Sequence, residues 1–247
     1  HAAGIHPVQV SASTYNLIKL AVYESKQNFG FNALIGPVVK LWHIGFKGAH
    51  VPTDEQIKEK MGLTNPGDVR LDDDNQTVFL TKKGMELDLG GIAKGYIADR
   101  IRDLWRAYDV RAGIINLGGN VLFVNSSPKR ASGEWILGVQ DPKKKRGNNL
   151  TTATVHECSA VTSGTYERFL EINGKRYHHI IDPKTGYPVK THVAGVTLFT
   201  RDSVQAEIEC KRLFFAGGPI PGWKNDKAGR YGAIFVYDDD SMERIGV

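Results

Sequence analysis

Long hydrophobic runs and cysteines are both scarce in this sequence, and each scarcity limits the classes of protein to which it can belong. No apolar stretch approaches the roughly 20 residues that a membrane-spanning helix requires, so we expect no membrane span within it. The cysteines are Cys158 and Cys210, and their spacing is not that of a metal site. Spacing alone does not establish a disulfide either, so the redox state of the two thiols stays open.

Several familiar catalytic and binding signatures are also missing. The glycines at Gly90 and Gly91 match neither G-x-G-x-x-G nor G-x-x-x-x-G-K-[ST], so the usual nucleotide-binding fingerprints do not apply. Ser163 lies in Val161–Thr165 without the G-x-S-x-G elbow, which argues against a serine hydrolase. The sequence also contains no internal repeat and no low-complexity linker, so it shows no clean domain boundary.

What the sequence does contain is typical of an ordinary globular protein of 247 residues, with 41% hydrophobic and 24% charged residues. This length suits one large domain or two small ones. The net charge is +5, and Lys143–Arg146 forms a basic run within a stretch rich in glycine and asparagine. Such a run is typical of a solvated loop, and without interleaved aromatic residues it does not indicate a nucleic-acid partner.

Strand and helix patterns are mixed along the chain and predict an α+β fold, with mixed β-sheets and surrounding helices. Helices are expected from a cap at Ser13 or Thr14 to Gly30, from a capping box at Thr53–Gln56 to Gly62, after Gly91, and over Ser203–Phe215 with Asp202 as N-cap. Strands are expected over residues 8–12, on both sides of the turn 72–76, and over 121–124, 135–139, 152–155, 168–172, 176–181, 193–200 and 233–237.

The segment Phe31–Trp42 is apolar and is interrupted by Gly36-Pro37. Two aromatic residues near its end, Trp42 and Phe46, either pack in the core or form an aromatic wall for a planar ligand. The core is the commoner role for such side chains, and we expect it here.

The stretch Leu87–Asp99, LDLGGIAKGYIAD, organises the middle of the chain. An alternating segment that ends at Leu89 predicts a strand. Gly90-Gly91 then leads into a helical pattern in which apolar residues share one face: Ala93, Ile97, Ile101, Leu104 and Trp105. The apolar run Ala112–Leu117 predicts a second strand before Gly118-Gly119. Strand, helix and strand in this order suggest a crossover unit.

Two interpretations of the first glycine turn remain open. Gly90 and Gly91 let the backbone approach a ligand closely, and the helix that follows offers N–H groups to an anion. Lys94 lies in the first helical turn, where a cation is unfavourable unless something negative binds nearby. The turn therefore either binds a phosphate or has a purely structural role.

A second group of chemically active side chains lies in Thr162–Tyr166 and Tyr177–Gly186. The turn Asn173-Gly174 predicts a hairpin that brings these two stretches side by side. Because side chains alternate along a strand, at most one of His178 and His179 faces a shared site, where a nearby aspartate could orient it as a general base. The alternative is a pair of surface histidines and a turn capped by Ser or Thr.

Four motifs occur in an order that resembles one protein family. They are LDLGGIAKGYIAD at Leu87–Asp99, INLGGN at Ile115–Asn120, TSGTYER at Thr162–Arg168 and HHIIDPKTGYPV at His178–Val189. Together they resemble the ApbE family, the FAD:protein FMN transferases or flavin transferases. With FNALIGPVVKLW and VPTDEQI included, the resemblance extends from about residue 4 to about residue 240. It implies an ApbE-like flavin transferase fold and a single domain over residues 1–247.

The resemblance implies a magnesium-dependent enzyme with FAD as its substrate. Such an enzyme splits the FAD pyrophosphate, transfers FMN through a phosphoester bond to a Thr or Ser hydroxyl of an acceptor protein, and releases AMP. The family pattern assigns His179 as the base for this hydroxyl, and Asp182 as the residue that orients the base or the metal shell. It implies these cofactor-binding residues: Gly90, Gly91, Ala93, Lys94, Asn116, Gly118, Gly119, Thr162, Ser163, Gly164, His179 and Ile180.

One departure from the family pattern affects the expected metal. Family members carry A-D-A-x-[ST]-T-A-L-F-x-x-G near the C-terminus, and its Asp and Thr ligate the cation. Alignment on Leu213-Phe214 places Glu207 and Lys211 at these positions. Glu207 and a main-chain carbonyl at Gly91 form the expected metal site, but a protonated lysine cannot ligate. Lys211 therefore either forms an ordinary i,i+4 ion pair with Glu207 or supplies an ammonium that partly replaces the metal.

Two other functions remain open beside FMN transfer. One is a flavin-binding protein that holds FAD without transferring it. The other is a metal-dependent FAD pyrophosphatase, in which water replaces the acceptor hydroxyl. The resemblance also implies a further N-terminal β-segment and an export or lipoprotein signal in the full-length protein. We therefore expect an exported acceptor, attachment through an N-terminal lipid anchor, and a location on the extracytoplasmic face of the bacterial cell envelope.

Overall fold

The computed structural model describes residues 2–247, and the chain divides into two compact units. Unit 1 comprises His1–Gly91 and Glu167–Lys190, and unit 2 comprises Ile92–Tyr166 and Thr191–Val247. The second segment of unit 1 is thus inserted into the sequence of unit 2. Since one domain can contain two compact units, the single domain expected over residues 1–247 stays a prediction.

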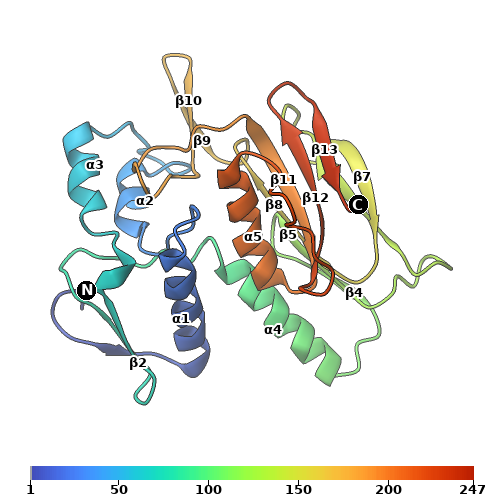
Figure 1. Ribbon diagram of the computed structural model, residues 1–247, viewed down its shortest axis with the longest axis horizontal. Helices are drawn as coiled ribbons and strands as arrows, with labels where there is room; N and C mark the ends of the chain where they lie inside the picture. Colours follow the sequence, from blue (N-terminus) through green and yellow to red (C-terminus); the bar gives the residue numbers. More distant parts are fainter. Residues whose placement is uncertain (1) are drawn as a thin grey trace. The chain divides into compact units, whose positions relative to one another are not determined.

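The helices of unit 1 are α1 (Ala12–Lys26), α2 (Gly36–Trp42) and α3 (Asp54–Met61) (Figure 1). α1 and α3 lie where the sequence predicts helices, and α2 forms within the apolar segment that ends at Trp42. The predicted apolar face of α1 is buried: Leu17, Ile18, Ala21 and Val22. The N-cap of α1 is Ser11 rather than Ser13 or Thr14, because the Ser11 hydroxyl accepts the N–H of Thr14 at 3.3 Å.

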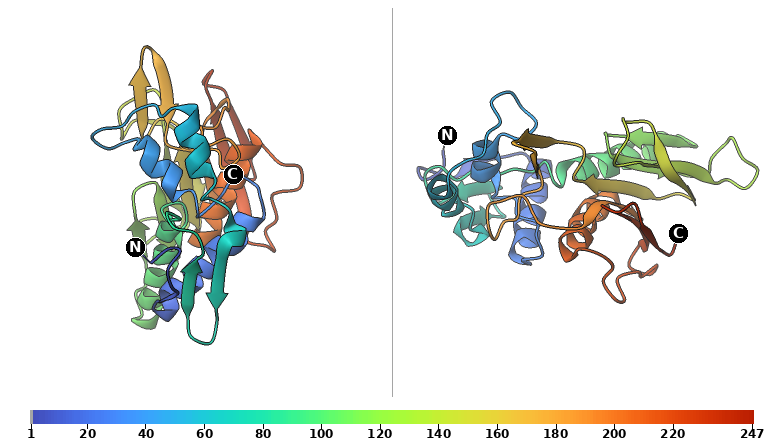
Figure 2. Two further views of the ribbon diagram at one scale, coloured as in Figure 1. Left: turned by 90° about the vertical axis from the view of Figure 1, so that its left-hand side faces the viewer. Right: turned by 90° about the horizontal axis from the view of Figure 1, so that it is seen from above.

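A small antiparallel sheet and a hairpin provide the strands of unit 1. The sheet has the order β1-β3-β2, and a 3₁₀ turn, η1, precedes β2. The strands β2 and β3 are the neighbouring teal arrows in the left view of Figure 2. The hairpin pairs β9 with β10 around Asn173-Gly174, as these turn residues predict. The bounds are Val8–Gln9 for β1, Pro66–Asp68 for η1, Val69–Asp72 for β2, Thr77–Leu80 for β3, Phe169–Ile172 for β9 and Lys175–His178 for β10.

The two aromatic residues near the end of α2 have different surroundings. Trp42 is 1% exposed, and its indole N–H donates to the Gly186 carbonyl at 2.8 Å, so its predicted place in the core is confirmed. Phe46 is 59% exposed and stacks on His43 with ring centroids 5.2 Å apart. The core prediction is therefore wrong for Phe46, because it lies in the loop after α2 and packs mainly on a neighbouring ring.

Unit 2 is built on a six-stranded antiparallel sheet with the order β13-β12-β11-β8-β5-β4. A separate hairpin pairs β6 with β7. The sheet strands are β4 (Gly113–Asn116), β5 (Asn120–Val124), β8 (Ser159–Gly164), β11 (Val193–Thr200), β12 (Arg230–Tyr237) and β13 (Met242–Ile245). The hairpin strands are β6 (Trp135–Gln140) and β7 (Asn149–Val155).

Both faces of this sheet are covered. The helices α4 (Ala93–Ala107) and α5 (Ser203–Ala216) pack on one face (Figure 1), and an apolar cluster joins the other face to β6 and β7. All eight residues of β11 are buried, as expected for a strand covered on both sides. Among the residues that the structure describes, no helix is long and apolar enough to cross a membrane.

The crossover unit predicted around Gly90-Gly91 does not form. The alternating residues up to Leu89 are irregular chain, in which the N–H of Asp88 donates to the Ala33 carbonyl at 2.7 Å. The strand after α4, β4, pairs antiparallel with β5 instead of lying parallel to an earlier strand. Of the alternating apolar residues Met85, Leu87 and Leu89, only Met85 is buried, and the segment forms no strand.

The buried face of α4 also differs from the apolar face in the sequence. Ile97 and Leu104 are 48% and 55% exposed, whereas the buried positions are Gly95, Ala98, Asp99 and Arg102. The apolar residues Ile101 and Trp105 are only partly buried, against the β4–β5 part of the sheet. The helix thus turns a small and charged face inward, because α5 packs against it there.

Both cysteines are free and buried in unit 2, so we expect neither to react in the folded protein. Burial raises the pKa of Cys158 to about 12 and that of Cys210 to about 11. Since the thiolate is the reactive form, an aromatic disulfide reagent at neutral pH should label both thiols at least about a hundredfold more slowly in native protein than in urea. Rapid labelling of the native chain would contradict this burial.

Candidate functional site

The turn between β4 and β5 depends on glycine. Gly118 and Gly119 have φ angles of 72° and 77°, a left-handed conformation that glycine adopts without strain. The Asn116 side chain accepts the N–H of Gly118 at 3.0 Å, and the Gly119 carbonyl accepts the N–H of Thr162 at 2.8 Å. The second bond joins the INLGGN turn to β8, so two of the sequence motifs meet in the sheet.

Lys94 lies in the first turn of α4, and its side chain reaches this glycine turn. Its ammonium donates to the Gly118 carbonyl at 3.1 Å and lies 4.0 Å from Oε1 of Glu207. The helix begins at Ala93, and among the described residues no side chain caps it at Ile92. Since the Lys94 side chain is 42% exposed, an anion at this point would meet both its charge and the N–H groups of the helix start.

Glu207, on α5, is 3% exposed and surrounded by polar groups. Its Oε1 accepts from the Asn120 amide at 2.9 Å, and its Oε2 accepts from the Lys211 ammonium at 3.0 Å. Lys211 also donates to the Glu207 carbonyl at 3.1 Å, and the Ser203 hydroxyl donates to Oδ1 of the buried Asn120 at 2.9 Å. Lys94, Asn120, Ser203, Glu207 and Lys211 are called the lysine–glutamate cluster below.

Gly95 makes this cluster possible because α4 and α5 approach closely at this residue. A Cβ atom at Gly95 would lie 2.3 Å from the Ser203 carbonyl oxygen and 2.8 Å from Cγ of Glu207. Any side chain here would therefore force the two helices apart. The glycine in A-K-G-Y thus acts through packing, and it places the Lys94 turn beside Glu207.

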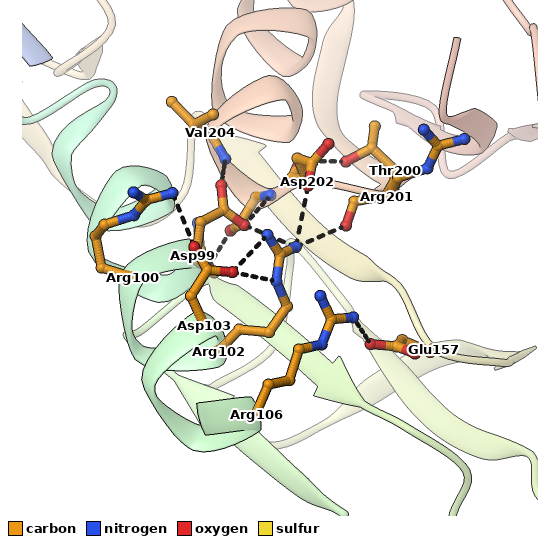
Figure 3. Close-up of polar contacts among 12 residues, drawn as sticks. Asp99, Arg100, Arg102, Asp103, Arg106, Glu157, Thr200, Arg201, Asp202 and Val204 are labelled. Atoms are coloured by element: carbon orange, nitrogen blue, oxygen red, sulfur yellow. Dashed lines mark hydrogen bonds and ion pairs between the residues drawn. The ribbon is translucent and has the colours of Figure 1, made fainter. Parts of the chain in front are cut away.

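A buried ion pair holds the start of α5 against α4 (Figure 3). Asp99 is 4% exposed, and its carboxylate accepts the N–H groups of Ser203 and Val204, both at 2.9 Å. Arg102 lies 3.1 Å from Asp99 and 3.1 Å from Asp202. Burial raises the pKa of Asp99, while the two N–H groups and the Arg102 charge act in the opposite direction.

The predicted N-cap of α5 is therefore wrong. Asp202 occupies the N-cap position, but its side chain makes no capping hydrogen bond within the described chain, and Asp99 of the other helix accepts the N–H groups instead. In the sequence, Asp99 is only the last residue of the motif Leu87–Asp99. Asp99 lies away from the apolar face of this helix, so helical periodicity gives no signal for its burial.

The TSGTY segment begins within the last part of β8, a strand that the sequence pattern did not predict. Thr162 lies opposite Thr197 of β11, and their hydroxyl oxygens are 2.8 Å apart. Ser163 and Gly164 are the last residues of the strand. Their predicted role in binding the cofactor stays a prediction, as does that of Thr162, whose hydroxyl is already paired within the sheet.

The neighbouring histidines His178 and His179, in unit 1, have different hydrogen bonds. His178 Nε2 lies 3.0 Å from the Val189 carbonyl, and its Nδ1 accepts the N–H of Ile180 at 3.3 Å. Both ring nitrogens of His178 are thus occupied by the backbone. His179 Nδ1 lies 3.2 Å from the Arg168 carbonyl, and because a carbonyl only accepts, Nδ1 carries the proton. In the neutral ring of His179, Nε2 is then the basic nitrogen.

The remaining site residues of unit 1 lie in turns. The carboxylate of Asp182 accepts the N–H of Lys184 at 2.8 Å, and its carbonyl accepts the N–H of Gly186 at 2.8 Å. This carboxylate therefore stabilises the DPKTG turn, and its role in orienting His179 stays a prediction. In the first glycine turn, Asp88 accepts the N–H of Gly90 at 2.8 Å, which is a structural use of that turn.

The surroundings of Glu207 do not fit a divalent cation. One carboxylate oxygen is bound by an amide and the other by the Lys211 ammonium, and a second ammonium, on Lys94, lies 4.0 Å away. A divalent cation bound to this carboxylate would be repelled by both ammonium groups. Within residues 2–247, no group of three or more His, Cys, Asp or Glu residues is placed to hold a metal. A metal ligand at the Gly91 carbonyl, in unit 1, stays a prediction.

Comparison with known proteins identifies similar sequences. The model of the ApbE family matches residues 1–234. The FAD:protein FMN transferases of Klebsiella pneumoniae (strain 342) and Treponema pallidum (strain Nichols) are 46% identical over 218 residues and 39% identical over 227 residues. These alignments cover 88% and 87% of this chain but 66% and 63% of the relatives. The chain thus spans slightly less than two thirds of the length of these curated relatives.

Solved structures show the same fold. The ApbE protein from Thermotoga maritima MSB8 has a TM-score of 0.84 and 31% sequence identity, over 97% of this chain and 78% of that chain. The flavinyl transferase ApbE of Pseudomonas stutzeri has a TM-score of 0.76 and 23% identity, over 98% of this chain and 75% of that one. These similarities confirm the predicted α+β class and flavin transferase fold.

Proposed function

The chain belongs to the ApbE family, and on this basis we propose that it transfers FMN from FAD to a Thr or Ser hydroxyl of an acceptor protein. The observation that carries this proposal is the similarity of most of the chain to relatives named FAD:protein FMN transferase. In the reaction, the hydroxyl oxygen attacks the phosphorus of the FMN moiety. The P–O bond to the AMP phosphate breaks, and AMP leaves with the bonding electrons.

The proposed base is His179 of unit 1. Its Nδ1–H donates to the Arg168 carbonyl, so Nε2 is the nitrogen that takes the proton from the acceptor hydroxyl. His178 is less suited to this role, because backbone groups engage both of its ring nitrogens. The choice of His179 over its neighbour thus follows its place in the motif, and the Arg168 carbonyl determines which of its ring nitrogens carries the proton.

The proposed anion site lies in unit 2. Lys94 and the N–H groups at the start of α4 offer positive charge and hydrogen bonds to phosphate oxygens. Gly118 and Gly119 expose backbone where a side chain would otherwise stand. No step of the proposed reaction uses a metal, since the residues around Glu207 do not fit one. The cell-envelope location and the lipid anchor belong to the proposal through the family resemblance alone.

Incubation of the protein with FAD, Mg²⁺ and a Thr-containing peptide that a relative can modify is expected to add one FMN to the peptide. Mass spectrometry would detect this addition, and chromatography of the nucleotides should show AMP released in equal amount. The same peptide with Val in place of Thr serves as the control and should stay unmodified. Free FMN and AMP with an unmodified peptide would indicate a pyrophosphatase, and intact FAD would indicate a binding protein. Either result would overturn the proposal.

A further inference from the structure

The lysine–glutamate cluster has the charge of an anion site rather than of a cation site. It contains two ammonium groups, on Lys94 and Lys211, and one carboxylate, on Glu207. The other two members, Asn120 and Ser203, are neutral and bind one another. The cluster therefore carries one net positive charge, which favours phosphate oxygens over a divalent metal ion.

The Lys211 ammonium lies beside Glu207 in the position that a metal ion bound to this residue would take. It bonds Oε2 and the main-chain carbonyl of Glu207 at 3.0 Å and 3.1 Å, the same kinds of oxygen that bind a hard metal ion. An ammonium has three N–H groups, and these two bonds use two of them. The side chain is 17% exposed, so it lies at the edge of the buried cluster and not deep within it.

A third cation approaches the same glycine turn. A Cβ atom at Gly118 would lie 4.0 Å from Nη2 of Arg146, the last residue of the basic run. Lys143 and Lys144 of this run instead form ion pairs with Asp240 and Asp141 at 2.7 Å and 3.0 Å. The turn that accepts the Lys94 ammonium thus has a guanidinium nearby, and guanidinium groups suit phosphate oxygens.

We infer that the ammonium groups of Lys211 and Lys94 replace a divalent cation in binding the pyrophosphate of FAD, so that FAD binding does not require Mg²⁺. The inference rests on the proposed function, because FAD is its ligand. The ammonium groups neutralise phosphate charge and donate hydrogen bonds to phosphate oxygens. Glu207 holds the Lys211 ammonium in position, as a carboxylate would otherwise hold the metal.

Titration of the intact protein with FAD in EDTA and in excess Mg²⁺ tests this inference directly. We expect the dissociation constant, measured from flavin fluorescence, to differ by less than about twofold between the two buffers, since the protein supplies its own cations. MgCl₂ alone should leave the thermal midpoint of the protein unchanged. Loss of affinity by tenfold or more in EDTA would overturn the inference.

Variants at position 211 identify the responsible group. In EDTA, Lys211→Thr should bind FAD at least about tenfold more weakly, because a charge-assisted contact is lost. Mg²⁺ should restore part of this affinity, since a hydroxyl and the Glu207 carboxylate can now ligate it. Lys211→Met should bind weakly in both buffers. Lys19→Thr is the matched control, because it also removes a helical lysine paired with a carboxylate, here that of the exposed Asp73.

The outcomes separate this inference from the proposed function. FAD binding in EDTA without FMN transfer would contradict the proposed function alone, and binding only with Mg²⁺ would contradict the inference alone. No FAD binding in either buffer would contradict both. If folded Lys211→Thr binds FAD in EDTA as tightly as the wild type, Lys211 forms only an ion pair and the inference is wrong. The wild-type titration decides the question even if the variants fail to fold.

Discussion

Replacement of His179 with alanine is expected to lower the rate of FMN transfer by about 10²- to 10⁴-fold, the range for loss of a general base. FAD binding should change little, because the proposed base acts on the acceptor hydroxyl and not on the pyrophosphate. The structure gives the reason for choosing this residue: its Nδ1–H is held by the Arg168 carbonyl, which leaves Nε2 as the basic nitrogen. Single-turnover kinetics with FAD and an acceptor peptide measure the rate, and fluorescence titration measures the binding.

His156→Ala is a suitable control for this experiment. His156 is exposed in unit 2, outside the proposed site, so its removal should leave both the transfer rate and FAD binding unchanged. Transfer by His179→Ala at the wild-type rate would show that another group takes the proton. A parallel loss of FAD binding would show instead that His179 holds the cofactor.

Asp99→Ala is expected to lower the free energy of unfolding by about 3 kcal/mol, because it leaves buried donors without an acceptor. The N–H groups of Ser203 and Val204 both donate to this carboxylate at 2.9 Å. Arg102 also loses one of its carboxylate partners, 3.1 Å away, although it keeps Asp202. Urea unfolding followed by circular dichroism measures the change.

Asp103→Ala is the matched control on the same helix. Asp103 pairs with Arg102 and with Arg100 (Figure 3), at 3.3 Å and 2.9 Å, but its side chain is 44% exposed. Exposed ion pairs contribute little, so this variant should lose less than about 1 kcal/mol. Equal losses in the two variants would show that general charge balance, and not the capping of α5, stabilises this interface.

Features whose cause lies within a few residues could be predicted. The capping box of α3 forms between Thr53 and Gln56, and the β9–β10 hairpin turns at Asn173-Gly174, because three or four neighbouring residues determine each of them. The apolar run of β11 is buried throughout, as its composition indicates. The family resemblance, which rests on motifs in order, likewise predicted a fold that solved structures confirm.

Features that depend on a partner elsewhere in the chain could not be predicted in this way. Asp202 has the composition of an N-cap, but Asp99, more than 100 residues earlier, accepts the N–H groups of α5. The alternating residues before Gly90 resemble a strand, yet no partner strand lies beside them in the described chain. Periodicity shows which side of a helix or strand is apolar, but it does not show which segment will pack against that side.

The sequence by itself determined the family and the α+β class and supplied the candidate site residues, because each of these is recorded in residue types and short spacings. Only the tertiary structure decided which of these residues act on one another. The close approach of α4 and α5 at Gly95 places Lys94 beside Glu207 and leaves room for the Lys211 ammonium there. Contacts between segments that are distant in sequence depend on how all the elements of the unit pack together, which short sequence patterns do not record.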